Sequence, residues 1–145
     1  MAANNVTRLL DSRKIAYQAF ELPAEKFGAL RTAELLGVSA HTLYKTIVVI
    51  REKAGKPILA IIPGDHEVDL KALAEAVHEK KVRVPTQSEA EKLTGLQAGG
   101  ISPLALVNKG FQMLLDISAR EQVEIHISGG QRGLNLRLPV AALIQ

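Results

Sequence analysis

The sequence predicts a single α+β domain, residues 1–145, built on a mixed β-sheet. Its 145 residues are 47% hydrophobic and 23% charged, a balance that suits one globular core. Strand-like segments do not alternate strictly with helical ones, and at least two neighbouring pairs have hairpin character, which argues against a doubly wound parallel sheet. No linker or internal repeat divides the chain.

The first third of the chain predicts a helix, a short strand and a second helix. Apolar residues recur at helical spacing over residues 6–10, and a strand is expected over 16–22. A helix is expected over 29–36, because Gly37 suits the left-handed turn that ends many helices.

The middle of the chain predicts a hairpin followed by a helix. Residues 46–51 and 57–63 are β-branched and apolar, and the polar segment 52–56 between them contains a glycine. Both strands have the composition of central strands. Asp69 offers an N-cap to an amphipathic helix, and a short strand is expected over 82–84.

The last third predicts one helix, an irregular loop and three strands. Thr86 and Glu89 have the spacing of a capping box, so a helix is expected from there to Thr94, with Gly95 ending it. The loop begins at Gly99. Strand-like runs then cover residues 111–117, 123–128 and 134–138, separated by a turn at 118–122 and by three glycines at 129, 130 and 133.

Composition removes several classes of chemistry. The chain has no cysteine, which excludes a disulfide, a thiolate nucleophile and cysteine-ligated zinc. Its longest apolar run, residues 58–63, is too short to span a bilayer, and no apolar signal segment precedes Arg8, so we expect a cytoplasmic protein. A net charge of +3 suits a polyanionic partner without requiring one.

Several familiar sites do not fit the spacing. Lys45 and Thr46 lack the preceding glycines of a phosphate-binding loop. The segment His66, Glu67 and Asp69, with Asp65 before it, could bind a metal, but a polar turn and helix cap is the favoured interpretation. The other histidines are scattered, and no Gly-x-Ser-x-Gly elbow is present. The sequence therefore predicts no metal and no cofactor.

Two features could still carry chemistry. Lys45 precedes a central strand, so its ammonium would be held at one end of a rigid sheet. In the segment 99–103, Gly99 and Gly100 leave backbone amides unobstructed, Ser102 lies in a rigid loop and Pro103 fixes the exit. Backbone amides aimed at a developing oxyanion are worth roughly 100- to 1000-fold each in rate.

These residues resemble the YbaK/EbsC family of aminoacyl-tRNA deacylases, which is related to the editing domain of bacterial prolyl-tRNA synthetases. The resemblance covers nearly the whole chain. Its specific motifs are Phe27-Gly28, Tyr44-Lys45-Thr46, the loop from Thr94-Gly95 to Gly99-Gly100-Ile101-Ser102-Pro103-Leu104, and the segment Ser128-Gly129-Gly130-Gln131-Arg132-Gly133-Leu134.

The resemblance implies a curved, largely antiparallel mixed sheet, barrel-like and flanked by helices. It implies a trans-editing deacylase that cleaves the ester of mischarged tRNA, with the acceptor end of aminoacyl-tRNA as partner, prolyl-tRNA synthetase as a further partner, and no membrane or DNA. The implied catalytic residues are Lys45, Gly99, Gly100 and Ile101. The implied substrate-binding residues are Phe20, Phe27, Thr46, Ser102, Pro103, Gly129, Gly130 and Asn135.

Two departures leave the amino acid open. Members that act on Cys-tRNA carry a tyrosine just before the Phe-Gly pair, whereas the nearest ring here is Phe20. Those members also have aspartate where this chain has Asn135, which keeps hydrogen bonding but loses the charge. Cysteine, alanine and serine all remain candidates. The alternative function is a noncatalytic module that binds tRNA ends, nucleotides or a synthetase.

Overall fold

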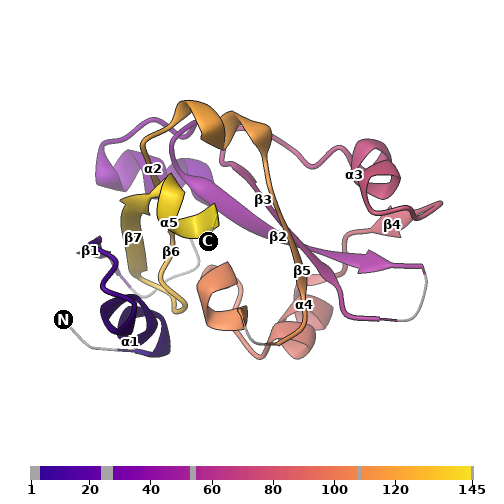
Figure 1. The fold of residues 1–145 in the computed structure, drawn as a ribbon, viewed down its shortest axis with the longest axis horizontal. Helices are drawn as coiled ribbons and strands as arrows, with labels where there is room; N and C mark the ends of the chain where they lie inside the picture. The colour runs from indigo at the N-terminus through magenta and orange to yellow at the C-terminus, as the bar shows by residue number, and fades with distance from the viewer. Residues whose placement is uncertain (1–3, 24–27, 53–54, 108, 145) are drawn as a thin grey trace.

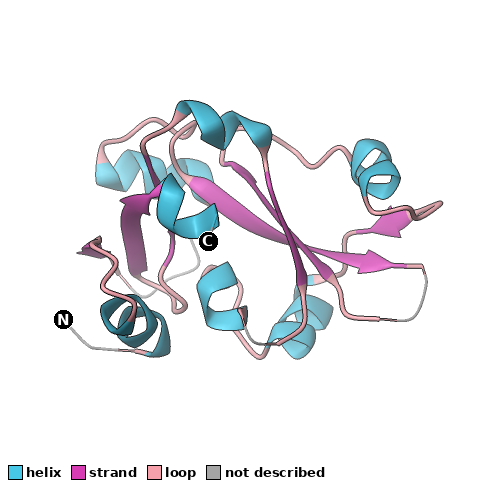
Figure 2. Ribbon diagram, in the orientation of Figure 1, coloured by secondary structure: helices cyan, strands magenta, loops and turns pink. Residues whose placement is uncertain are grey.

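The computed structural model describes residues 4–23, 28–52, 55–107 and 109–144. Figure 2 shows the helices arranged around two groups of strands. In chain order, with η for a 3-10 helix, the elements are α1 (Asn5–Ser12), β1 (Gln18–Glu21), α2 (Ala29–Leu36), β2 (Tyr44–Arg51), β3 (Ile58–Pro63), α3 (Leu70–Ala76), β4 (Val82–Arg83), α4 (Gln87–Thr94), η1 (Pro103–Leu106), β5 (Gln112–Leu115), η2 (Ile117–Glu121), β6 (Glu124–Ser128), β7 (Leu134–Pro139) and α5 (Val140–Ile144).

The predicted hairpin forms the centre of a four-stranded sheet with the order β4-β2-β3-β5. β2 and β3 pair antiparallel, from Tyr44 opposite Pro63 to Val49 opposite Ile58. Both strands are inner strands, as their β-branched and apolar composition predicts. β5 joins β3 in parallel, so the expectation of a mixed sheet is confirmed.

A second sheet of three antiparallel strands, β1-β7-β6, lies beside the start of β2, with α3 and β4 at the far end of the longer strands (Figure 1). In the described parts of the chain, the two sheets meet through an isolated bridge between Leu43 and His126. At this bridge the amide hydrogen of His126 bonds to the Thr42 carbonyl at 2.9 Å, and β2 pairs with β3 and β4 along its length. The barrel-like expectation is wrong in this respect, because the described strands do not close.

The helix ends follow the predicted capping chemistry. Both hydrogen bonds of the capping box between Thr86 and Glu89 are present, and the Asp69 carboxylate accepts the amide hydrogen of Ala72. Gly37 and Gly95 end their helices in the left-handed conformation. The sequence did not predict η1 or α5 as helices, since such short elements carry too few residues for a helical period to show.

Side chains of β2 alternate between the two faces of the four-stranded sheet. Ile47 and Val49 pack with the apolar side of α3, and Val48 packs with Leu106 of η1 and with Ala90 of α4. A third cluster fills the space between the second sheet and helices α1 and α5. Among the described residues, no helix is long and apolar enough to cross a membrane.

Candidate functional site

A cavity of about 250 Å³ lies where the two sheets approach each other. The start of β2, α2, the 98–101 loop and the ends of β6 and β7 all contribute to its wall. Its lining residues are Leu22, Ala29, Thr32, Leu43, Tyr44, Lys45, Thr46, Ala98, Gly99, Ile101, Ser128, Gly133, Leu134 and Asn135. The cavity therefore brings together five of the residues singled out from the sequence, namely Lys45, Thr46, Gly99, Ile101 and Asn135.

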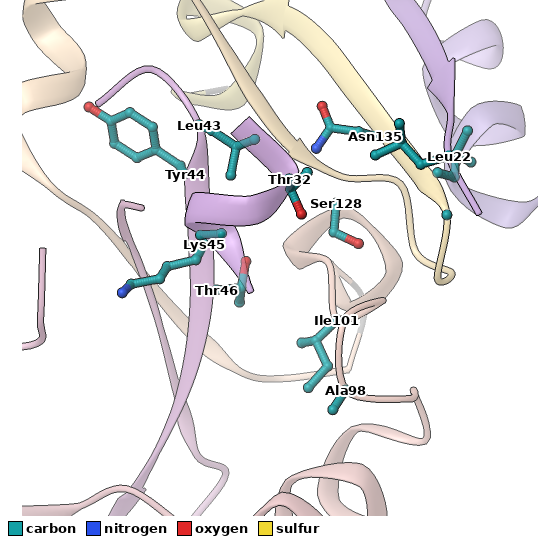
Figure 3. A pocket seen from close by; sticks show the side chains of 14 residues that line it. Leu22, Thr32, Leu43, Tyr44, Lys45, Thr46, Ala98, Ile101, Ser128 and Asn135 are labelled. Carbon is teal, nitrogen blue, oxygen red and sulfur yellow. The ribbon is translucent and has the colours of Figure 1, made fainter. Parts of the chain in front are cut away.

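Lys45 and Thr46 leave β2 on opposite faces. Lys45 lies opposite Ile62 and shares its face with Ile47, which packs toward α3. Its ammonium lies 3.9 Å from the Glu67 carboxylate, whose side chain is 98% exposed. Figure 3 shows the Lys45 side chain extending away from Ile101 and from Ser128. The ammonium therefore lies toward Glu67, away from the 98–101 loop (Figure 3), whereas Thr46 is on the other face of β2.

The loop opposite Thr46 begins with a tight turn over residues 97–100. The amide hydrogen of Gly100 bonds to the Gln97 carbonyl at 2.8 Å, and Gly99 has a φ of +89°. A positive φ at the third position is typical of a type II turn, which requires glycine there. The Gly100 amide is thus used inside the turn and is not available to a ligand. Within the described residues, the amide hydrogens of Gly99 and Ile101 have no acceptor.

Two charged side chains hold the loop at Ala98. The amide hydrogen of Ala98 bonds to the Glu91 carboxylate at 2.8 Å, and the Ala98 carbonyl accepts from Arg132 Nε at 2.6 Å. Arg132 and Glu91 lie 4.0 Å apart and are largely shielded from solvent. The loop is therefore connected both to α4 and to the turn between β6 and β7.

Asn135 presents its amide to the cavity from β7. Its side-chain oxygen lies 2.8 Å from Nδ1 of His126, a buried residue of β6. Figure 3 shows the Asn135 nitrogen directed toward Thr32 and the oxygen directed the other way. Burial lowers the pKa of His126, and the hydrogen bond to Asn135 opposes that shift. A neutral imidazole that donates from Nδ1 keeps this amide orientation.

Comparisons with known proteins identify the family of this chain. The family described as aminoacyl-tRNA editing domain matches residues 25–145. A protein of Enterococcus faecalis named as a candidate Cys-tRNA(Pro)/Cys-tRNA(Cys) deacylase, EbsC, is 34% identical over 142 residues, which cover 97% of this chain and 85% of that protein. The chain belongs to the aminoacyl-tRNA editing domain family.

Other relatives carry the editing domain inside a longer protein or share its fold. A proline–tRNA ligase of Thermodesulfovibrio yellowstonii is 29% identical over 123 residues, which cover 85% of this chain but only 20% of the ligase. A crystal structure described as a candidate trans-editing enzyme for prolyl-tRNA synthetase has a TM-score of 0.78 and 24% identity, covering 99% of this chain and 92% of that one. A crystallised hypothetical protein reaches a TM-score of 0.88, also at 24% identity, over 97% of this chain and 92% of that protein.

Several residues proposed from the sequence lie outside this cavity. Ser102 is fully buried, and its hydroxyl oxygen accepts the amide hydrogen of Leu104, so it caps η1. Pro103 lines a separate apolar groove beside α1 and α5. Both residues shape the exit of the loop and do not line the cavity. Phe27 lies outside the described residues.

Gly129 and Gly130 shape the turn between β6 and β7. The amide hydrogen of Gly129 bonds to the Leu134 carbonyl at 2.8 Å, and Gly130, with a φ of +93°, packs against Val6. Phe20 lies beside the His126 ring with centroids 5.6 Å apart, and it is not among the lining residues. These residues support the wall from behind.

The sequence did not single out Leu22, Thr32, Leu43 or Ser128 as cavity residues. Thr32 and Ser128 add hydroxyl groups, and the Ser128 hydroxyl accepts the amide hydrogen of Gly130 at 3.3 Å. Each lies in a different part of the chain, so no local pattern could have joined them. Partial signals were the place of Thr32 on the predicted helix over 29–36 and the place of Ser128 at the start of the glycine-rich motif over 128–134.

The polar turn after β3 has two structural roles. Asp69 caps α3, as predicted, and Glu67 pairs with Lys45. His66 and Asp65 of this turn lie close to His41, which is in the turn before β2. One possible ligand atom from each of the three lies within 4.8 Å of the others. All three side chains are between 41% and 54% exposed, which suits a solvated polar cluster.

Proposed function

We propose that this chain is a trans-editing aminoacyl-tRNA deacylase whose reaction takes place in the cavity between the two sheets. The observation that carries the proposal is that Lys45, Gly99, Ile101 and Asn135 line one cavity. A cation suits the phosphates of the tRNA end, and unpaired amides suit the oxygen of an ester carbonyl.

Backbone amides are the main source of transition-state stabilisation in this scheme. Water, or the thiol of a cysteinyl substrate, attacks the ester carbonyl carbon, and negative charge develops on the carbonyl oxygen beside the amide hydrogens of Gly99 and Ile101. The bond from the carbonyl carbon to the ribose oxygen then breaks. The ribose oxygen takes up the proton that the attacking group loses. Among the described cavity residues, no hydroxyl bonds to a histidine or a carboxylate, so we assign no serine or threonine nucleophile.

Lys45 binds the phosphate of the terminal nucleotide in this proposal. Lys45 lines the cavity, and its partner among the described residues is the fully exposed Glu67, at 3.9 Å. Such an exposed ion pair is worth little, so a phosphate can displace the carboxylate. The ester end of the substrate would lie deeper in the cavity, near the loop amides.

The substrate is an amino acid with a small side chain. A cavity of about 250 Å³ must hold the aminoacyl group and part of the terminal ribose, which leaves little room for a large side chain. Cysteine, alanine and serine are the candidates. Small differences of this kind give a synthetase only about 1 to 3 kcal/mol of discrimination, which makes a separate editing pocket useful. Prolyl-tRNA synthetase is the proposed protein partner, and the cytoplasm is the proposed location.

A deacylation assay tests the proposal. The protein is incubated with tRNA(Pro) charged with cysteine, alanine, serine or proline, and the loss of each ester is followed over time. We expect faster loss of at least one small aminoacyl ester, a lower rate for Lys45→Ala, and an unchanged rate for Lys71→Ala, an exposed lysine on α3.

Absence of turnover on every substrate, with the folded protein in excess, would refute the enzyme assignment. Tight tRNA binding that Lys45→Ala does not change, without turnover, would instead favour the noncatalytic binding module.

A further inference from the structure

The peptide group between Ala98 and Gly99 is the central peptide of the turn over residues 97–100. Its carbonyl oxygen accepts the hydrogen bond from Arg132 at 2.6 Å. In a trans peptide the carbonyl and the N–H point in opposite directions. The Gly99 N–H therefore points away from Arg132, and Gly99 lines the cavity whereas Arg132 does not.

This peptide has two available orientations. Type I and type II turns differ mainly by a flip of the central peptide, and glycine at the third position tolerates both. The neighbouring peptide cannot flip freely, because Gly100 and Glu91 hold its carbonyl and its N–H. The flip of the Ala98–Gly99 peptide would direct a carbonyl oxygen, in place of an N–H, toward the substrate.

We propose that Arg132 is a positioning residue that keeps this peptide in the orientation required for catalysis. The inference rests on the proposed deacylase function and assigns Arg132 no contact with the substrate. A guanidinium that donates to a carbonyl also polarises the peptide, which strengthens the N–H of Gly99 as a donor. Glu91 lies 4.0 Å from Arg132 and orients the guanidinium.

Steady-state kinetics of Arg132→Ala and Arg132→Lys test the proposal. For Arg132→Ala we expect kcat to fall about 100-fold, the lower end of the loss for one oxyanion donor, and KM to change less than about threefold. Arg132→Lys, which keeps a charged donor, recovers part of the rate, and guanidinium added to Arg132→Ala recovers more. Arg83→Ala is the matched control, because it also removes an ion pair between an arginine and a glutamate of α4, here Glu89. We expect kcat of Arg83→Ala to stay within about twofold of the wild-type value.

The flip itself is read by NMR, independently of catalysis. The ¹⁵N–¹H signal of Gly99 shifts in Arg132→Ala and is unchanged in Arg83→Ala. Gly99→Ala also disfavours the orientation that Arg132 stabilises, because alanine rarely adopts a φ of +89°. The loss of kcat in the double variant Gly99→Ala/Arg132→Ala should therefore be smaller than the product of the two single losses. If Arg132→Ala does not fold, Arg132→Lys and Gly99→Ala carry the test.

The outcomes separate the two proposals. An inactive wild-type protein refutes the deacylase function, and the Gly99 signal then still decides the orientation of the peptide. If the wild type is active, the role of Arg132 is overturned by a folded Arg132→Ala variant with unchanged kcat. It is also overturned if the Gly99 signal of that variant is unchanged.

Discussion

His126 and Asn135 form a buried hydrogen-bonded pair, with Nδ1 of the imidazole 2.8 Å from the side-chain oxygen of the amide. The pair lies across β6 and β7 directly behind the cavity wall. Asn135 reaches the cavity only with its nitrogen side, because its oxygen is engaged by the imidazole (Figure 3). The protonation state of one buried histidine is therefore linked to the stability of this wall.

Acidification should destabilise the protein through His126. Burial lowers the pKa of this imidazole below its ordinary value of 6.5, and nearby Arg137 adds to the shift while Glu124 opposes it. His126 therefore binds a proton more readily in the unfolded chain than in the folded protein. The contribution of neutral His126 to the free energy of unfolding is complete above about pH 6.5, and it is lost as the pH falls toward the pKa of His126 in the folded protein. Urea unfolding of wild type and His126→Gln between pH 7.5 and 5 measures this. The free energy of unfolding of the variant should depend less on pH than that of wild type, and an equal dependence would refute the role of His126.

Binding of tRNA should weaken as salt rises, and Lys45 should account for about one phosphate contact. Replacement of a lysine that neutralises one phosphate lowers the slope of log affinity against log salt by about 1. Fluorescence anisotropy with labelled tRNA at several KCl concentrations compares wild type, Lys45→Ala and Lys71→Ala. An unchanged slope for Lys45→Ala would contradict the phosphate role, and only that variant is expected to differ from wild type.

Gly100→Ala should destabilise the fold by about 1 to 3 kcal/mol, because a Cβ there is forced into its neighbours. It would lie 2.8 Å from the backbone of Gln131, where flexible side-chain movement offers no relief. The midpoint of urea unfolding measures the effect. Gly28→Ala is a matched control, since its φ is −71° and nothing lies within 4 Å of the added Cβ. Equal loss at both positions would refute the packing argument.

Tyr44→Phe should cost about 1 kcal/mol of stability through loss of one buried hydrogen bond. The Tyr44 hydroxyl lies 2.6 Å from the Ser118 hydroxyl, and the tyrosine ring is 1% exposed. A double-mutant cycle with Ser118→Ala isolates the pair, and its two single losses should add to more than the loss in the double variant. Strict additivity of the two changes would show that the hydroxyls do not interact energetically.

Local sequence patterns were sufficient for most of the helices and strands. The β2–β3 hairpin, the capping box at Thr86 and the Asp69 cap depend on residues within a few positions of one another, and all three predictions are confirmed. The family resemblance rests likewise on short motifs in a fixed order, and membership in the editing domain family is confirmed. Such features are encoded locally, so a single sequence reveals them.

The use of each backbone group could not be predicted from the glycine-rich loop. Gly99 and Gly100 look equivalent in sequence, yet the Gly100 amide bonds within the turn and the Gly99 amide does not. The Ala98 carbonyl of the same turn bonds to Arg132, which lies more than thirty residues further along the chain, so the loop sequence does not reveal that contact. Ser102 is another case, because its burial as a helix cap follows from packing and not from its neighbours.

The sequence by itself determined the strand pairing at the centre of the fold, the helix ends and the family, because these depend on side-chain periodicity, backbone preferences and ordered short motifs. The tertiary structure alone decided that the two sheets meet at an isolated bridge between Leu43 and His126, that the Lys45 ammonium lies beside Glu67 and that Asn135 turns its nitrogen inward. Each of these depends on contacts between separate segments, such as Thr42 with His126 and Lys45 with Glu67, which only the folded chain brings together.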